Sequence, residues 1–271
     1  MRLIEILAFA VPLLTLISFS GPMTRGGGVP ADNLPAAPAP LQAIYTEHLG
    51  SIIDSARNPS TPISMTGTDL GSAFERDGKL IFLFGDAQSP DRAYYDGDPA
   101  AWVDPAANPL VTGAIPKLHW YLEKPDRFLP LRIPSVNLGP MNVPVEAVAI
   151  GPDTYVFAAT DFNLAKARHS SLALARTKGL AFESLSLVNV TPTEKFIVVS
   201  VITEGDTLYI FGSGHYRRSA VYLAKVEAAQ IADRDAWTYF RGNDYWSCST
   251  TSWITNSLSS RLLRGMAKPP C

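Results

Sequence analysis

Three carboxylates stand where acid–base chemistry could take place, because each lies in or beside a segment that is apolar or rich in glycine. Asp69 falls within TGTDLG, in a polar break ahead of a strand, and we predict that it acts as a base or nucleophile. Asp86 follows an apolar strand that ends in FGD. Glu146 lies in PVEAVAI, an apolar setting that suits a general acid.

Each of these carboxylates also has an ordinary structural explanation. Asp69 could be a turn residue that bonds its own backbone. Asp86 could cap the end of a strand, and Glu146 could face solvent at the start of one. The sequence leaves both interpretations open for all three residues.

Other side chains are predicted to contact a ligand rather than to react with it. Asp161 ends a strand candidate, and His215 and Arg217 follow another. Trp102 could stack on a ring of a bound ligand, although core packing is the commoner fate of an aromatic side chain. A surface loop is the alternative for His215 and Arg217, and Glu204 in TEGD is expected to be a solvated turn residue.

Three similar segments, which must position these side chains, recur along the chain at 77–86, 152–161 and 205–214. Each begins with a turn signal of Gly, Pro or Asp, continues as an apolar strand with an aromatic residue, and ends in small residues. Further strand candidates precede them at 63–68, 145–150 and 196–202. A unit of several strands that recurs about every 50 residues is typical of a β-propeller blade. A β-sandwich is the alternative.

The composition supports a globular, strand-rich protein. The chain has 271 residues, of which 46% are hydrophobic and 18% charged, and its formal charge is −2. It therefore has enough apolar residues for a sizeable core, and it lacks the excess of Lys and Arg that is typical of a nucleic-acid-binding protein. Its 22 prolines and 19 glycines favour turns and short strands, so helix is expected to be scarce.

Four regions are predicted. Residues 1–20 have the charge, the apolar run and the small-residue site of a signal peptide, with a membrane anchor as the alternative. Residues 21–43 form a Pro/Gly/Ala-rich linker, and 44–247 a partial propeller. Residues 248–271 form a tail without strand alternation and without Asp or Glu. We therefore expect a secreted protein that does not contact a membrane once the signal peptide is removed.

TGTDLG followed by FGD resembles a motif pair of a secreted propeller family that was first catalogued as a domain of unknown function. Some members of that family are endo-D-arabinanases. The segments Leu208–Gly214 and Trp237–Phe240 extend the resemblance, which covers about residues 60–247. It implies an all-β, five-bladed type of propeller that hydrolyses furanosides, with a polysaccharide or oligosaccharide as the partner.

The resemblance implies a secreted glycoside hydrolase that cleaves arabinofuranosyl linkages of a D-arabinan-like polymer. Such hydrolysis needs two carboxylates, and Asp69, Asp86 and Glu146 are the candidates. Only three blades and the start of a fourth are expected here, so the ring would be incomplete and activity could be lost through truncation. A propeller that only binds carbohydrate, or one that binds proteins, is the alternative. No cofactor is expected, although a central channel could hold a structural calcium ion.

Overall fold

Antiparallel β-sheet makes up nearly all the regular structure in the part of the chain that the computed structural model describes. That part comprises residues 48–54, 56, 58–88, 97–104, 106, 114–139, 142–160, 171–192, 195–214, 219–241 and 246–247. The predicted signal peptide (1–20), linker (21–43) and tail (248–271) lie outside it. The sheets all belong to one unit, Ile52–Cys271.

Three sheets, named blades 1 to 3 here, are meanders whose strands pair in chain order. Blade 1 comprises β1 (Gly67–Arg76), β2 (Lys79–Gln88), β3 (Ala100–Val103) and β4 (His119–Trp120). Blade 2 comprises β7 (Val143–Ile150), β8 (Asp153–Thr160), β9 (Ser171–Lys178) and β10 (Ser186–Pro192). Blade 3 comprises β11 (Val198–Glu204), β12 (Thr207–Ser213), β13 (Val221–Glu227), β14 (Thr238–Phe240) and β15 (Trp246–Ser247).

The remaining regular elements are short. A hairpin of β5 (Leu122–Lys124) and β6 (Arg127–Phe128) follows blade 1. Three 3₁₀ turns are η4 (Phe182–Ser184), η5 (Ala228–Gln230) and η6 (Arg234–Ala236). The described residues contain no α-helix, which agrees with the expected scarcity of helix.

The hairpin that begins blade 1 shows why the turn signals are effective. Asp77 and Gly78 connect β1 to β2 with φ angles of 51° and 68°. A two-residue turn with positive φ at both positions matches the twist of the flanking strands, and Asp-Gly is a favoured pair for it. The Asp-Gly signal therefore fixes the register in which Arg76 pairs with Lys79.

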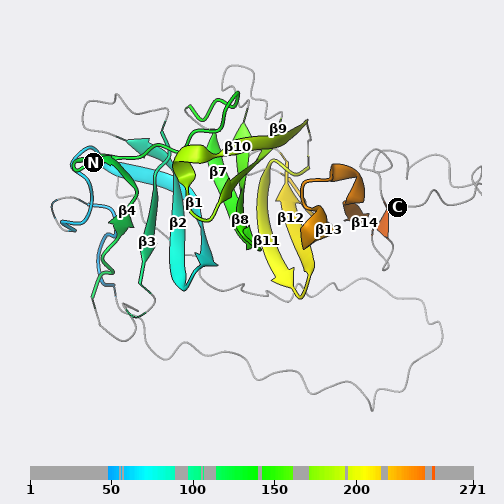
Figure 1. Cartoon of the computed structure of the whole chain (residues 1–271), viewed down its shortest axis with the longest axis horizontal. Coiled ribbons are helices and arrows are strands. Elements are labelled where there is room, and N and C mark those ends of the chain that lie inside the picture. The colour runs from blue at the N-terminus through cyan, green and yellow to red at the C-terminus, as the bar shows by residue number, and fades with distance from the viewer. Residues whose placement is uncertain are drawn as a thin grey trace, which may run out of the picture. The chain divides into compact units, whose positions relative to one another are not determined.

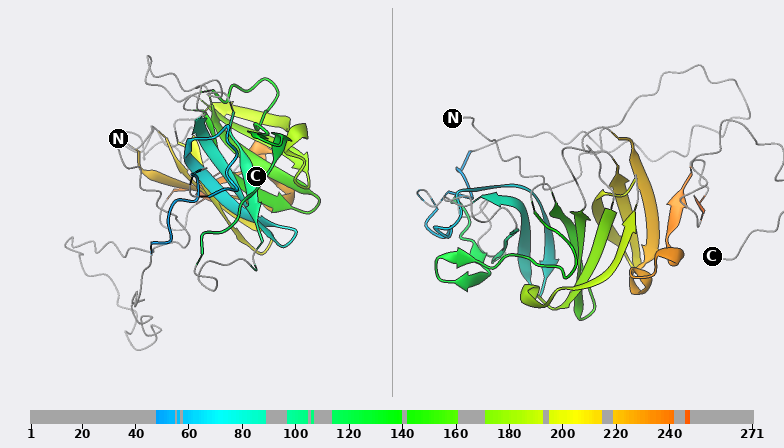
Figure 2. Two further views of the ribbon diagram at one scale, coloured as in Figure 1. Left: turned by 90° about the vertical axis from the view of Figure 1, so that its left-hand side faces the viewer. Right: turned by 90° about the horizontal axis from the view of Figure 1, so that it is seen from above.

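The three sheets follow one another side by side, and the first strand of blade 2, β7, lies against both β1 and β11 (Figures 1 and 2). Four-stranded meanders whose first strands gather together are the construction of a β-propeller. The predicted all-β, propeller-type fold is thus confirmed, with three blades in the described residues. The five-bladed count stays a prediction.

One expected strand was misplaced. The first strand of blade 1 was expected at 63–68 but spans Gly67–Arg76, so TGTDLG enters the sheet instead of preceding it. Its pairing with β2 shifts register on both sides of Asp69. Glycines tolerate such bulges, which allow a polar, glycine-rich segment to continue a strand.

Apolar side chains fill the spaces between the sheets. One buried cluster joins Phe74, Ile81 and Leu83 of blade 1 to small residues of blade 2 such as Ala158. A second cluster joins blade 2 to blade 3, with Trp237 fully buried. A third covers the other side of blade 1 with residues from the segments 53–65 and 118–128.

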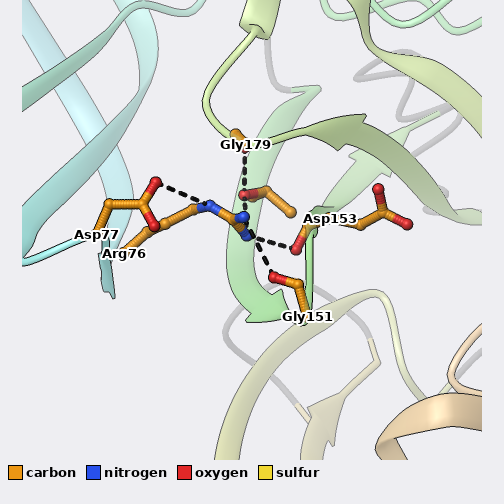
Figure 3. Close-up of polar contacts among 6 residues, drawn as sticks. Arg76, Asp77, Gly151, Asp153 and Gly179 are labelled. Atoms are coloured by element: carbon orange, nitrogen blue, oxygen red, sulfur yellow. Dashed lines mark hydrogen bonds and ion pairs between the residues drawn. The ribbon is translucent and has the colours of Figure 1, made fainter.

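A buried arginine adds a polar tie between blades 1 and 2 (Figure 3). Arg76, at the end of β1, donates from Nη1 to the carbonyl of Asp153 at 2.7 Å and from Nη2 to the carbonyl of Gly151 at 3.2 Å. It also reaches Oγ1 of Thr154, which donates to the carbonyl of Gly179 at 2.6 Å. The charged side chain thus supplies donors to the turn between β7 and β8.

Candidate functional site

The bulged end of the β1–β2 pair carries two of the predicted carboxylates. Asp69 on β1 lies opposite Gly85 on β2, the residue before Asp86. Directly opposed residues of an antiparallel pair have Cα atoms about 4.5–5.5 Å apart. The register therefore brings the backbones of Asp69 and Asp86 to the same end of blade 1.

Local contacts hold this end in its irregular shape. Thr68 donates from Oγ1 to the carbonyl of Gly85 at 2.5 Å. Gly71 has a φ of +147°, and a Cβ there would collide with the carbonyl oxygen of Leu83. Only glycine allows this close approach, so the second glycine of TGTDLG is required by the backbone itself.

Asp86 is half-buried and adopts a left-handed conformation with a φ of 49°. Its backbone N–H donates to Oδ1 of Asp98 at 2.9 Å. Asp98 is 2% exposed, and its own carbonyl accepts from the N–H of Leu131 at 2.7 Å. The Asp98 side chain therefore fixes the backbone of Asp86 in a conformation that non-glycine residues seldom adopt.

Burial raises the pKa of Asp98 well above its usual range, and the charge of the neighbouring Asp86 raises it further. The hydrogen bond from the Asp86 backbone opposes these effects in part. No described residue forms a hydrogen bond with Oδ2 of Asp98. A carboxyl group whose pKa is shifted by burial and by a second carboxylate is an arrangement found at functional sites.

Sequence reasoning missed Asp98. It stands in Gly97-Asp98-Pro99, a combination that indicates an exposed turn. The structure instead buries it in an isolated bridge with Leu131. No local pattern distinguishes it from an ordinary turn aspartate, because the residues that bury it come from elsewhere in the chain.

Glu146 lies where the first strands of all three blades meet. It is 9% exposed, and four donors approach its carboxylate. Oε1 accepts from the Ser72 hydroxyl on β1 and from the N–H of Ala147 at 3.0 Å. Oε2 accepts from the hydroxyl of Ser200 at 3.1 Å and the N–H of Val201 at 3.2 Å, both on β11. This carboxylate thus joins β7 to both neighbouring blades.

The three carboxylates predicted as catalytic therefore divide into two places. Asp69 and Asp86 share the bulged end of blade 1. Glu146 contacts Ser72, which lies three residues beyond Asp69 on β1, or about 10 Å along the strand. The role of each in catalysis stays a prediction.

Of the residues predicted to bind substrate, only Trp102 is described. It lies on β3, where it pairs with Ile81 on β2 and His119 on β4. Its ring stacks on that of His119 at 4.1 Å, and Nζ of Lys79 is 4.0 Å from the ring centroid. These contacts engage the indole ring within blade 1, and its use as a sugar platform stays a prediction. Asp161, His215 and Arg217 lie outside the described residues.

The described residues include no group of three or more His, Cys, Asp or Glu side chains arranged to hold a metal ion. Glu146, the carboxylate between the inner strands, already accepts four protein hydrogen bonds. This donor set does not fit the structural calcium ion considered from the sequence. In the same part of the chain, no helix has the length and apolarity needed to span a membrane.

Several solved structures are partly similar to this chain. A Bacteroides ovatus protein, proposed to be a hydrolase, has 11% identity and a TM-score of 0.45, with 70% of this chain and 56% of that one covered. An alpha-L-arabinofuranosidase from Clostridium thermocellum has 12% identity and a TM-score of 0.42, with 74% and 60% covered. An exo-1,5-alpha-L-arabinanase from a bovine ruminal metagenomic library has 9% identity and a TM-score of 0.33, with 69% and 78% covered.

This chain spans 56% and 60% of the first two of those structures, and the propeller assignment rests on the arrangement of its own sheets. No curated protein matches the chain in sequence. The family profile of the domain of unknown function DUF4185 matches residues 54–260. That match includes all three blades and continues past Ser247, where the resemblance seen in the sequence ended. The chain therefore belongs to the DUF4185 family.

Proposed function

We propose that this chain is a propeller-type glycoside hydrolase that cleaves arabinofuranosyl linkages of a D-arabinan-like polysaccharide outside the cell. The observation that carries the proposal is the register of β1 and β2. It sets Asp69 opposite Gly85, the residue that directly precedes Asp86. Glycoside hydrolysis needs two carboxyl groups, and this pair of neighbouring strands carries one on each strand at the same end. The TGTDLG and FGD resemblance supplies the choice of substrate class.

In the proposed reaction, one carboxyl group donates its proton to the glycosidic oxygen as the bond from that oxygen to the anomeric carbon breaks. The second carboxylate either takes a proton from the water that attacks this carbon or attacks the carbon itself, and water then cleaves the ester. We assign the base or nucleophile to Asp69 and the acid to Asp86. Asp98 is a positioning residue in this proposal, because it fixes the Asp86 backbone.

Glu146 receives a different role from the one first considered. A general acid must carry a proton toward the substrate, whereas both oxygens of Glu146 accept hydrogen bonds from the protein. We therefore propose that it positions β1, and with it Asp69, relative to the other inner strands.

The second candidate function is carbohydrate binding without catalysis. The engagement of Glu146 favours it, because that geometry removes one of the three carboxylates from direct chemistry. A binding protein would retain affinity for arabinan and show no turnover, so one set of assays distinguishes the two functions.

The test is an assay of reducing ends released from D-arabinan by the purified chain. We expect Asp69→Asn and Asp86→Asn each to lower turnover by at least about 100-fold, because an amide cannot act as base, nucleophile or acid. Glu75→Gln is the matched control, since Glu75 is an exposed carboxylate on the same strand, and it should retain turnover.

Wild-type turnover in Asp69→Asn would overturn the assignment of Asp69. Binding of arabinan by the wild-type chain without any release of reducing ends would overturn the hydrolase proposal and favour carbohydrate binding. Circular dichroism and thermal melting of each variant would establish that lost activity does not reflect unfolding.

A further inference from the structure

The peptide bond between Asp98 and Pro99 lies just before β3, at a buried position. Bonds of this type are the most acid-sensitive in a polypeptide. The aspartate carboxyl can attack the carbonyl carbon of its own residue and close a five-membered ring. The tertiary amide nitrogen of proline also leaves more readily than a secondary amide nitrogen. The rate at such a bond depends on what surrounds the carboxyl group and the carbonyl.

The Asp98 side chain has one oxygen held and one oxygen without a partner. Oδ1 accepts from the Asp86 N–H at 2.9 Å, which orients the carboxyl group. Oδ2 has no hydrogen-bond partner among the described residues, although Asp98 is buried. Buried polar atoms are nearly always hydrogen-bonded, and a reactive role is one explanation for an exception. Oδ2 is therefore the atom available for attack.

The backbone on both sides of the Asp98–Pro99 bond is held by neighbouring segments. The carbonyl oxygen of Asp98 accepts from the N–H of Leu131, which is buried, at 2.7 Å. Attack on this carbonyl places negative charge on its oxygen, and a backbone N–H aimed at such an oxygen stabilises that charge. The carbonyl of Pro99 accepts from the Phe84 N–H at 2.9 Å. Fixed groups of this kind favour reaction within the molecule.

The nitrogen of Pro99 also needs a proton when it leaves. A protonated carboxyl group has one O–H to donate, and Asp98 can supply this proton itself. Burial and the charge of Asp86 raise the pKa of Asp98, so its carboxyl keeps a proton to a higher pH than an ordinary aspartate does.

We propose that the Asp98–Pro99 bond is a self-cleavage site, at which the chain cuts its own backbone. Oδ2 forms a bond to the carbonyl carbon of Asp98, and the bond from that carbon to the nitrogen of Pro99 breaks as the carboxyl proton moves to this nitrogen. The products are a cyclic anhydride on Asp98 and a secondary amine on Pro99. One water molecule then opens the anhydride to two carboxyl groups. The net reaction is the hydrolysis of one peptide bond.

The two pieces, 1–98 and 99–271, should stay together after the cut. The four residues of β3 continue to pair with β2, so blade 1 keeps its hydrogen bonds on the far side of the cut. The cut instead frees Asp98, whose side chain fixes the backbone of Asp86. The proposal does not depend on glycoside hydrolysis, and its product is visible without any sugar.

The sequence contains a second Asp–Pro pair, Asp104–Pro105, which serves as an internal reference. Asp104 is exposed, and its Oδ1 accepts from the Ala106 N–H at 2.8 Å. The two bonds have the same intrinsic chemistry, so a difference in their rates measures the effect of the surroundings. In the folded chain we expect cleavage after Asp98 to be at least about 10-fold faster than cleavage after Asp104. In urea the two rates should become similar.

The test is incubation of the purified whole chain at mildly acidic pH with protease inhibitors, followed by denaturing electrophoresis and intact-mass measurement. We expect fragments that end at Asp98 and begin at Pro99. Asp98→Asn should slow their formation at least about 100-fold, because the amide has no carboxyl proton to transfer. Asp104→Asn is the matched control and should leave the rate unchanged. Added hydroxylamine should convert the new end at Asp98 to a hydroxamate, since it traps an anhydride, whereas a contaminating protease would leave the acid.

Pro99→Ala provides a second variant that retains the Asp98 carboxyl, in case Asp98→Asn does not fold. It replaces the tertiary amide by a secondary one and should slow cleavage at least about 10-fold. Circular dichroism establishes that each variant is folded. A chain that stays intact, equal cleavage at the two Asp–Pro bonds of the folded chain, or a cut without a hydroxamate would overturn the proposal. A chain that cuts itself but releases no reducing ends from arabinan would contradict the hydrolase proposal alone.

Discussion

Ser72 on β1 donates a hydrogen bond to Oε1 of Glu146 on β7, across the junction of blades 1 and 2. The other carboxylate oxygen accepts from the Val201 N–H on β11, and so meets a backbone donor at the edge of blade 3. Edge strands carry backbone groups that need partners, and Glu146 provides one where three sheets converge. The carboxylate is thus an inter-blade connection, and it contacts β1 three residues beyond Asp69.

Glu146→Gln should lower the free energy of unfolding by about 1–3 kcal/mol. The amide keeps only one acceptor oxygen, so one set of donors from β1 or β11 would face an NH₂ group. Urea denaturation of Glu146→Gln measures the effect, with Glu75→Gln as the control. Because Glu75 is exposed, the control should change the free energy of unfolding by no more than about 0.5 kcal/mol. Unchanged stability with abolished turnover would return Glu146 to a catalytic role.

Arg76→Ala should destabilise the fold by about 2–4 kcal/mol. The change removes charged donors from the carbonyls of Gly151 and Asp153 and leaves these partly buried oxygens without them. Thermal and urea unfolding, monitored by circular dichroism, would measure the loss.

Arg176→Ala is the control for Arg76. Arg176 also pairs with Asp153, at 3.6 Å, but its side chain is 51% exposed. Exposed ion pairs contribute about 0–1 kcal/mol, so this variant should unfold nearly as the wild type does. Equal losses in the two variants would contradict the importance given to the buried arginine.

Asp98→Asn should change how stability depends on pH. Burial and the charge of Asp86 raise the pKa of Asp98, so the folded state binds its proton more tightly than the unfolded state does. The contribution of Asp98 to the free energy of unfolding therefore falls as pH rises from the unfolded pKa, about 4, through the raised folded pKa. The asparagine does not titrate and keeps an acceptor for the Asp86 N–H.

We therefore expect the melting temperature of Asp98→Asn, relative to the wild type, to increase as pH rises above about 4 and then to level off. Melting curves across this range measure the difference. Parallel profiles for the two proteins would show that Asp98 does not titrate differently in the folded and unfolded states.

The parts of the fold that depend on neighbouring residues were predictable from the sequence. The apolar segments at 77–86, 152–161 and 205–214 became β2, β8 and β12, because turn signals and strand patterns act over a few residues. The repeat of these patterns was sufficient to predict the blades.

Contacts between blades were not predictable in this way. Arg76 reaches the Asp153 carbonyl across 77 residues of sequence, and nothing near Arg76 distinguishes it from an exposed strand end. Asp98 looks like a turn residue until Leu131 and Asp86 are placed beside it. Glu146 lies in an apolar strand, as expected, but three of its four donors come from two other sheets, which the local sequence does not indicate.

The cover on the outer side of blade 1 has a consequence for how the protein is made. Strands pair with their neighbours in sequence, so each sheet can form as soon as it leaves the ribosome. Blade 1 receives its outer cover from residues up to Phe128, before any strand of blade 2 has emerged. Each later sheet then shields its predecessor during synthesis, and the newest sheet is always the one with bare apolar side chains. Chaperones and other nascent chains should therefore bind a nascent chain mainly at the sheet that was translated last.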